Sequence, residues 1–171
     1  MPRQVSAGVL VYRTGPAGPE FLLVHPGGPF WARKDLAAWS IPKGLMDPGE
    51  ETWAAAAREF AEELGQALTP GVLAAAPQPL SPCPTPGGKL VLAWLAPADL
   101  DLSDLRSNLF ELEWPRGSGR LREYPEIDRA AWFGLDDARR AAVRGQVPFL
   151  DRLMHVLQST GAAEHGDLQM E

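Results

Sequence analysis

The sequence predicts an α+β fold, and three parts of its hydrophobic pattern support this prediction. Residues 5–12 and 20–25 are rich in apolar and β-branched side chains, as in a pair of strands. Residues 52–64 show the periodicity of an amphipathic helix, and further strand-like and helical segments follow. Strands on both sides of a helix, with a closing helix near the C-terminus, are typical of an α+β domain.

The length and composition are those of one globular domain. The chain has 171 residues, of which 45% are hydrophobic and 22% charged. We expect the domain to span residues 1–158. Residues 159–171 are polar and lack core side chains, so we expect them to form a flexible C-terminal tail.

Further strands are predicted after the first helix. Residues 72–76 and 89–96 are expected to be strands separated by a proline-rich loop at residues 77–86. Residues 108–115 alternate like a strand or an extended loop, and residues 126–133 lead into a short strand.

Two helices are predicted near the C-terminus. Residues 135–144 begin with acidic and end with basic side chains, which complements the helix dipole, and Gly145 follows as a stop signal. Pro148 is suited to open a second helix whose inner side is apolar.

Charge and cysteine content argue against several kinds of partner. The net charge of −6 and the lack of Lys/Arg clusters argue against a general nucleic-acid surface. The apolar run at residues 5–12 is too short and interrupted for a signal peptide or a membrane span. Cys83 is the only cysteine, so no internal disulfide can form, and we expect a cytoplasmic protein. The sequence carries no signal for a particular oligomeric state.

The predicted helix at residues 52–64 has an apolar side and an acidic side. Five residues form one apolar stripe: Trp53, Ala57, Phe60, Ala61 and Leu64. Glu59, Glu62 and Glu63 lie on the other side, within reach of one another, where like charges repel. Hard oxygen donors on one rigid face suit Mg²⁺ or Mn²⁺. The alternative is a solvated acidic helix face that binds no metal.

The spacing around this helix resembles the Nudix box, G-x5-E-x7-R-E-U-x-E-E-x-G-U, in which U is a bulky apolar residue. The matching positions are Gly44, Glu50, Arg58, Glu59, Phe60, Glu62, Glu63 and Gly65. The match spans residues 44–66 and departs from the pattern at Gln66, where the family has an apolar residue that packs the helix end. The resemblance implies the Nudix α/β/α sandwich, with a mixed sheet between helices.

The resemblance also implies a metal site. It assigns the metal ligands to the carboxylates of Glu59, Glu62 and Glu63, completed by the backbone carbonyl of Gly44. The metal is expected to be Mg²⁺, with Mn²⁺ as a possible substitute.

Two further roles follow from the same resemblance. Glu50 and Arg58 are expected to hold the loop before the helix through charged hydrogen bonds. The general base is expected to be Glu126 or Glu62, because family members differ in which glutamate serves. Glu123 is the alternative to Glu126.

The reaction that the resemblance implies is hydrolysis of a pyrophosphate bond in a nucleoside diphosphate linked to another moiety. The triplet Pro42-Lys43-Gly44 is similar to the variant found in hydrolases of diadenosine and diphosphoinositol polyphosphates. A dinucleoside polyphosphate such as diadenosine tetraphosphate is therefore the expected small-molecule substrate, and Lys43 would supply a positive charge beside the metal. The alternatives are a nucleoside triphosphate or ADP-ribose substrate, or a module that senses a nucleotide without cleaving it.

The loop at residues 27–38 carries further candidate substrate contacts. Trp31, Arg33 and Lys34 are suited to stacking a base and contacting phosphate. The alternative is a lid that its own aromatic side chains pack against the core. His25, which ends the preceding strand, is expected to have a structural role.

The segment at residues 97–126 also contains an aromatic side chain followed by arginines. Arg116, Arg120 and Arg122 could bind a base and phosphate together with that aromatic residue, and a solvated loop is the alternative.

Overall fold

A mixed sheet between two layers of helices forms the body of the protein. The structure is a computed structural model that describes residues 4–74 and 77–166. The main sheet contains β1 (Val5–Gly15), β2 (Gly18–Pro26), β3 (Lys43–Leu45), β4 (Gln78–Pro84), β5 (Leu90–Pro97) and β8 (Ile127–Gly134). The strand order is β4-β5-β1-β2-β8, and β3 pairs with β1 beside this path. β1 and β5 are parallel, and the other paired strands are antiparallel.

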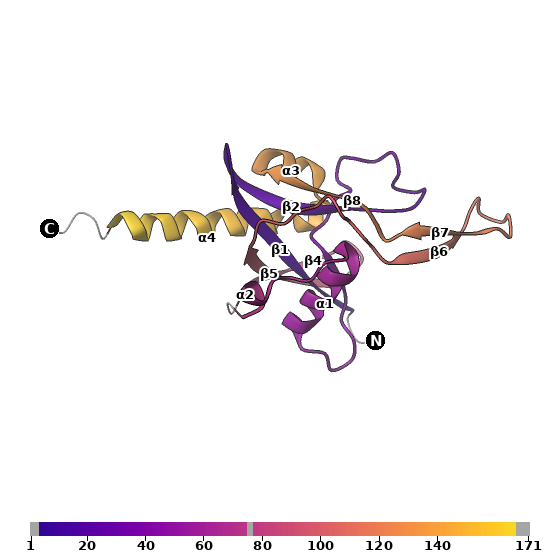
Figure 1. Cartoon of the computed structure of the whole chain (residues 1–171), viewed down its shortest axis with the longest axis horizontal. Coiled ribbons are helices and arrows are strands. Elements are labelled where there is room, and N and C mark those ends of the chain that lie inside the picture. The colour runs from indigo at the N-terminus through magenta and orange to yellow at the C-terminus, as the bar shows by residue number, and fades with distance from the viewer. Residues whose placement is uncertain (1–3, 75–76, 167–171) are drawn as a thin grey trace.

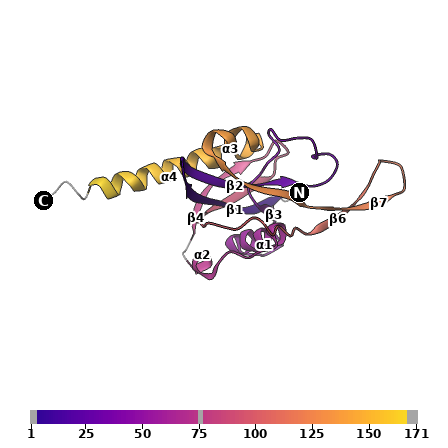
Figure 2. The same cartoon turned by 45° about the horizontal axis from the view of Figure 1, so that its top comes forward.

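Helices cover both faces of this sheet (Figure 1). On one face lie α1 (Thr52–Leu64) and α2 (Pro70–Ala74), and on the other lie α3 (Leu135–Ala141) and α4 (Val147–Gly166) (Figure 2). A short 3-10 turn, η1 (Arg144–Gln146), connects α3 to α4. This arrangement confirms the predicted α/β/α sandwich with a mixed sheet between helices.

The two central strands are buried on both faces. Leu10 and Phe21 point into the core under α3 and α4, whereas Val9 and Leu22 point into the core under α1. Side chains alternate between the faces of a strand, so a strand covered on both sides needs a continuous apolar run. This explains why the two N-terminal strands could be predicted from composition alone.

The ends of α1 are defined by specific caps. The Glu51 carboxylate accepts hydrogen bonds from the backbone N–H groups of Trp53 and Ala54 at the N-terminus. Gly65 ends the helix in the left-handed conformation, with φ of 69°. A Cβ at residue 65 would overlap the Arg106 carbonyl oxygen, so the chain can pass closely here only because residue 65 is glycine.

The buried face of α1 differs slightly from the predicted stripe. Phe60 and Leu64 are fully buried as expected, but Ala55 and Ala56 are buried as well. The remaining members of the predicted stripe are only partly buried: Trp53, Ala57 and Ala61. Trp53 still packs at the edge of this face, where its ring meets that of Trp94 edge to face with centroids 5.9 Å apart.

Two predictions for the middle of the chain are wrong. The strand expected at residues 72–76 is instead the helix α2, which Pro70 can open because proline is favoured in the first helical turn; residues 75–76 lie outside the described residues. The proline-rich segment expected to be a loop is the strand β4. β4 occupies the edge of the sheet, where prolines need not donate hydrogen bonds, and its register shifts between Leu80 and Cys83.

The C-terminal helices differ from prediction in their bounds. α3 ends at Ala141, earlier than expected, and η1 follows. α4 continues beyond residue 159 through Gly166, so part of the predicted tail is helical, and residues 167–171 of that tail lie outside the described residues. Within the described residues, no helix is long and apolar enough to cross a membrane.

A separate hairpin extends from the body of the protein. β6 (Leu109–Glu113) and β7 (Leu121–Pro125) form a two-stranded antiparallel sheet that projects beyond the main sheet (Figure 1). Of the two predictions for residues 108–115, the strand is therefore confirmed. The hairpin leads directly into β8, so its base lies next to the main sheet.

The close approach at Gly65 gives a prediction for stability. Gly49 serves as the comparison, because it also has a positive φ but a Cβ there would meet none of the described atoms within 4 Å. We expect Gly49→Ala to lower the free energy of unfolding by about 1–2 kcal/mol through backbone strain alone. Gly65→Ala should cost a further ~1–3 kcal/mol, because its Cβ would also displace the backbone at Arg106. Urea denaturation of the two variants measures the difference, and equal losses would contradict the proposed steric constraint.

Candidate active site

The site is built around a close contact between β3 and α1. β3 pairs with β1 through Gly44 and Ala7, which fixes the backbone of residue 44 beside the helix. A Cβ at residue 44 would overlap the Glu59 carboxylate. The glycine therefore allows a carboxylate of α1 to lie directly against the backbone of β3.

Arg58 connects the helix to the preceding loop. Its guanidinium donates from Nε to Glu50 Oε1 at 2.8 Å and from Nη2 to Glu50 Oε2 at 2.9 Å. Nη2 also donates to the Leu45 carbonyl at 3.2 Å, and Nη1 donates to Glu59 Oε1 at 2.8 Å. One planar side chain thus holds both ends of the loop and one carboxylate of the helix.

Glu50 is held in its ionised form by this arrangement. Its Oε2 also accepts a hydrogen bond from the Asp47 backbone N–H at 2.9 Å. The Arg58 hydrogen bonds, followed by the Asp47 hydrogen bond, lower the pKa of Glu50 to about 2. These contacts are those expected of a pair that organises the loop.

The carboxylates of α1 are not a solvated surface. The side chain of Glu59 is 13% exposed and that of Glu62 is 40% exposed. Glu63 lies deeper, and its Oε2 accepts a hydrogen bond from the Lys43 backbone N–H at 3.0 Å. The helix therefore turns two of its three carboxylates toward β3, which disfavours the alternative of a solvated acidic face.

Burial makes the charges of these carboxylates unfavourable. It raises the pKa of Glu63 to about 8, with smaller contributions in the same direction from the charges of Glu59 and Glu126. Burial also raises the pKa of Glu59, against the opposing effect of Arg58. Partly buried carboxylates that repel one another favour a bound cation, since it would neutralise them.

The donor set fits a hard divalent cation. In the part of the chain that the structure describes, no three His, Cys, Asp or Glu side chains already surround a common point. Glu59 Oε1 is occupied by Arg58, and Glu63 Oε2 by the Lys43 N–H. The chemistry of the site nevertheless suits Mg²⁺ or Mn²⁺, because the Glu59 carboxylate lies against Gly44 and the Glu63 carboxylate against the backbone of Lys43, so hard oxygen donors gather at one point of β3.

Glu126 is brought close to these carboxylates by the base of the hairpin. Its backbone N–H donates to the Asn108 carbonyl at 2.8 Å, and the Asn108 N–H donates to the Glu62 carbonyl at 3.2 Å. The charge of Glu126 contributes to the raised pKa of both Glu59 and Glu63. Glu123 instead lies in β7, exposed and opposite Glu111.

In the loop at residues 27–38, not all of the side chains predicted to contact substrate lie toward the carboxylates. Trp31 is half-buried and packs against the core cluster under α3 and α4, and Lys34 Nζ lies 4.8 Å from its ring centroid. Arg33 is exposed. For Trp31 the geometry favours the lid alternative over base stacking. Lys43, in contrast, lies beside Glu63, where its charge favours the ionised carboxylate.

A buried histidine that the sequence left without a specific function anchors this loop. His25 Nε2 donates to the Lys34 carbonyl at 2.7 Å, and Nδ1 lies 2.6 Å from Asp128 Oδ1. The second contact is attractive only while a proton lies between the two atoms. Arg129 adds an ion pair to Asp35 at 2.9 Å, so β8 holds the loop at two adjacent positions. No sequence signal connected Asp128 with His25, because the contact joins residues from distant segments.

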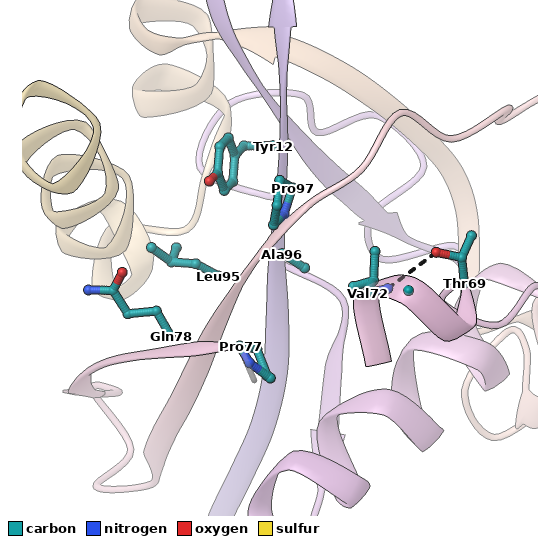
Figure 3. A pocket seen from close by; sticks show the side chains of 9 residues that line it. Tyr12, Thr69, Val72, Pro77, Gln78, Leu95, Ala96 and Pro97 are labelled. Carbon is teal, nitrogen blue, oxygen red and sulfur yellow. Dashed lines mark hydrogen bonds between the residues drawn. The ribbon is translucent and has the colours of Figure 1, made fainter. Parts of the chain in front are cut away.

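A cavity lies away from this site. It has a volume of about 500 Å³ and lies between α2 and the adjacent ends of β1, β4 and β5 (Figure 3). Its lining contains no carboxylate or basic side chain: Tyr12, Thr69, Gly71, Val72, Pro77, Gln78, Leu95, Ala96 and Pro97. Such a lining offers no charged group for a phosphate or a metal.

Comparisons with known proteins show a family and a fold that this chain shares. The NUDIX domain family matches residues 2–153. The bis(5′-nucleosyl)-tetraphosphatase (asymmetrical) of Caenorhabditis elegans is 41% identical over 58 residues, which are 34% of this chain and 38% of the relative. An RNA pyrophosphohydrolase of Bradyrhizobium diazoefficiens is 59% identical over 29 residues, 17% of each chain. The matched segments thus span well under half of these curated relatives.

The fold is also similar to that of solved structures. A crystal structure of a C. elegans Ap4A hydrolase binary complex superposes with a TM-score of 0.62 and 25% sequence identity. The superposition covers 91% of this chain and 98% of that chain. The likeness therefore extends over the whole sandwich, well beyond the segment around α1.

The raised pKa of Glu63 predicts how stability depends on pH in metal-free protein. The pKa of Glu63 is about 8 in the folded state and 4.5 as its reference value, so the stabilising contribution of the protonated carboxyl is present below pH 4.5 and is lost as the pH rises through 8. We expect Glu63→Gln, which keeps the neutral form at all pH values, to melt a few degrees above the wild type at pH 9 but close to it at pH 4.5. Thermal melts in EDTA measure this, and a difference that does not change with pH would contradict it.

Proposed function

This chain belongs to the Nudix hydrolase family, and on that basis we propose that it hydrolyses a pyrophosphate bond in a dinucleoside polyphosphate such as diadenosine tetraphosphate, with Mg²⁺ as its metal ion. The observation that carries the proposal is the placement of two carboxylates mostly out of solvent, Glu59 against Gly44 and Glu63 against Lys43. This arrangement is unfavourable for an isolated protein and favourable for one that binds a cation and a polyanion.

In this proposal Glu59, Glu62 and Glu63 hold the metal, and the Gly44 carbonyl completes the set. When bound, the metal neutralises phosphate oxygens and lowers the pKa of a coordinated water. Arg58 and Glu50 bind no substrate; they position the loop so that Gly44 stays against the helix. Lys43 places a positive charge where the phosphates of the substrate would lie.

The proton of the attacking water is accepted by Glu126 or Glu62. Glu126 is supported by its electrostatic contact with both buried carboxylates and by its position at the junction of the hairpin and β8. Both side chains have the access to water that a base needs, since Glu126 is exposed and the side chain of Glu62 is 40% exposed. A properly placed base contributes about 10²–10⁴-fold to a rate.

Two features support a dinucleoside polyphosphate as the substrate, and one feature has to be overcome. The triplet Pro42-Lys43-Gly44 is similar to the one in diadenosine polyphosphate hydrolases. The C. elegans relatives are named as hydrolases of such compounds. The net charge of −6 would repel a polyanion, so the local basic side chains near the site must offset that repulsion.

Two broader features belong to the same proposal. Residues 1–158 constitute the Nudix domain. The protein works in the cytoplasm, where its single cysteine, buried beside Arg152, would stay reduced.

A substrate panel tests this function. Purified protein with Mg²⁺ is incubated with diadenosine polyphosphates, nucleoside triphosphates, ADP-ribose and diphosphoinositol phosphates, and the products are identified by mass. We expect the highest kcat/KM for a diadenosine polyphosphate. Preference for another compound would move the proposal to that substrate class, and hydrolysis of none would favour a nucleotide-sensing role.

Substitution of the metal set provides a second test. Glu63→Gln should abolish Mg²⁺-dependent hydrolysis because it removes a ligand, and it should not lower the melting temperature of the metal-free protein, because an amide replaces a buried carboxyl group with a pKa of about 8. Near-native turnover of this variant would contradict its assignment as a ligand.

A matched pair of variants identifies the base. Glu126→Gln should reduce kcat by about 10²–10⁴-fold, whereas Glu123→Gln, in the adjacent strand but exposed on the hairpin, should change it little. If Glu126→Gln retains near-native kcat, Glu126 is not the base, and the assignment moves to Glu62.

A further inference from the structure

The β6–β7 hairpin has two chemically different faces. Its register pairs Phe110 with Tyr124, Leu112 with Arg122 and Glu111 with Glu123. Because side chains alternate across a strand, one face carries Phe110, Leu112, Trp114, Arg120, Arg122 and Tyr124. The opposite face carries Leu109, Glu111, Glu113, Leu121, Glu123 and Pro125. Aromatic and basic groups are thus separated from the acidic ones.

The aromatic and basic face is turned toward the loop at residues 27–38. The rings of Phe30 and Trp114 meet edge to face, with centroids 5.1 Å apart, and the Arg116 guanidinium lies 5.6 Å from the centre of the Phe30 ring. Nearer the base of the hairpin, a Cβ on Gly28 would lie 3.2 Å from the Phe110 ring. Phe30 nevertheless remains 44% exposed, so one side of this aromatic pair is open to a ligand.

The arginines of the hairpin differ from most others in this acidic chain. Within residues 4–74 and 77–166, neither Arg116 nor Arg120 nor Arg122 forms an ion pair. The carboxylates that could pair with them face the other way, and Glu111 stands directly opposite Glu123, an arrangement that destabilises a hairpin. Stability of the hairpin therefore does not explain this separation, whereas a site for an anionic ligand with an aromatic group does.

The base of the hairpin meets the catalytic carboxylates. Glu126 directly follows β7, and its carbonyl accepts a hydrogen bond from the Gly27 N–H at 2.9 Å. At ~3.3 Å per residue, Arg120 lies roughly 17 Å along the strand from Pro125. This distance is too long for a nucleoside bonded directly to the reacting phosphates, and it suits a second nucleotide farther along an extended substrate.

We infer that the face formed by Phe30, Trp114, Arg120 and Arg122 binds the far nucleotide of an elongated substrate. The base stacks on the exposed Phe30 ring, which Trp114 supports edge to face, and the guanidinium groups of Arg120 and Arg122 contact the phosphates that lead to it. The inference rests on the proposed function for the location of the reacting phosphates. The ligand chemistry, a base joined to a phosphate chain, is shared by the second half of a dinucleoside polyphosphate and the second nucleotide of a 5′-phosphorylated RNA.

Equilibrium binding in EDTA tests this surface separately from catalysis. The full chain is titrated with diadenosine tetraphosphate, with a short 5′-triphosphorylated RNA and with ATP. We expect Phe30→Ala and the double variant Arg120→Ser/Arg122→Ser to raise the Kd of one or both elongated ligands by about 5- to 150-fold. The Kd of ATP, which has no second nucleotide, should rise less. Circular dichroism and melting temperature verify that both variants fold.

A matched control removes the same charge elsewhere. Arg139→Ser/Arg140→Ser deletes two exposed arginines from α3, so it reproduces the change in net charge without altering the hairpin. The Kd of each elongated ligand should stay within twofold of wild type in this control. An equal loss of binding in the control would show general electrostatic attraction and overturn the inference.

The remaining outcomes are also decisive. Loss of diadenosine tetraphosphate binding alone identifies a dinucleotide, and loss of RNA binding alone identifies an RNA end. Unchanged binding of both, or an equal loss for ATP, overturns the surface. If the hairpin variants weaken binding but the wild type hydrolyses no nucleotide, the proposed function fails while this surface stands. If hydrolysis proceeds and the variants bind normally, the proposed function stands and this surface is overturned.

Discussion

The hydrogen bonds of Arg58 are the constraint on which the candidate site depends. The guanidinium binds both oxygens of Glu50, the Leu45 carbonyl and Glu59, so a single side chain joins the loop after β3 to the middle of α1. With the loop held, Gly44 stays against the Glu59 carboxylate, where no other residue would fit. The arginine therefore fixes the position of the carboxylates to which we assign the metal.

In the protein alone, the negative charge of the carboxylates at the site is only partly balanced by positive side chains. Glu63 is held out of water and is close enough to Glu59 and Glu126 to feel their charges, while Lys43 and Arg58 compensate only in part. A divalent cation would complete the balance on the protein side, and basic groups around the site would attract the phosphates. The hairpin has an imbalance of the opposite sign, because its arginines form no ion pairs with carboxylates in the described part of the chain.

The sequence predicted the features that depend on local spacing. The strands that flank the box, the helix α1 and its acidic residues follow from patterns within a few turns of the chain. The strand β4 was missed because a strand tolerates prolines only at the edge of a sheet. The edge position of β4 depends on the strand order of the whole sheet, which no local pattern shows. The contact of His25 with Asp128, the packing of Trp31 and the orientation of the hairpin join segments far apart in sequence, and no local pattern contains them.

The most direct test of this account is to locate the metal itself. Crystals grown with Mn²⁺ in place of Mg²⁺ would be measured for anomalous scattering at the manganese edge. We expect a peak bound by carboxylate oxygens of Glu59, Glu62 and Glu63 and by the Gly44 carbonyl, with Arg58 still bonded to Glu50. A fully occupied peak held by other groups, with these oxygens left in their present contacts, would contradict it.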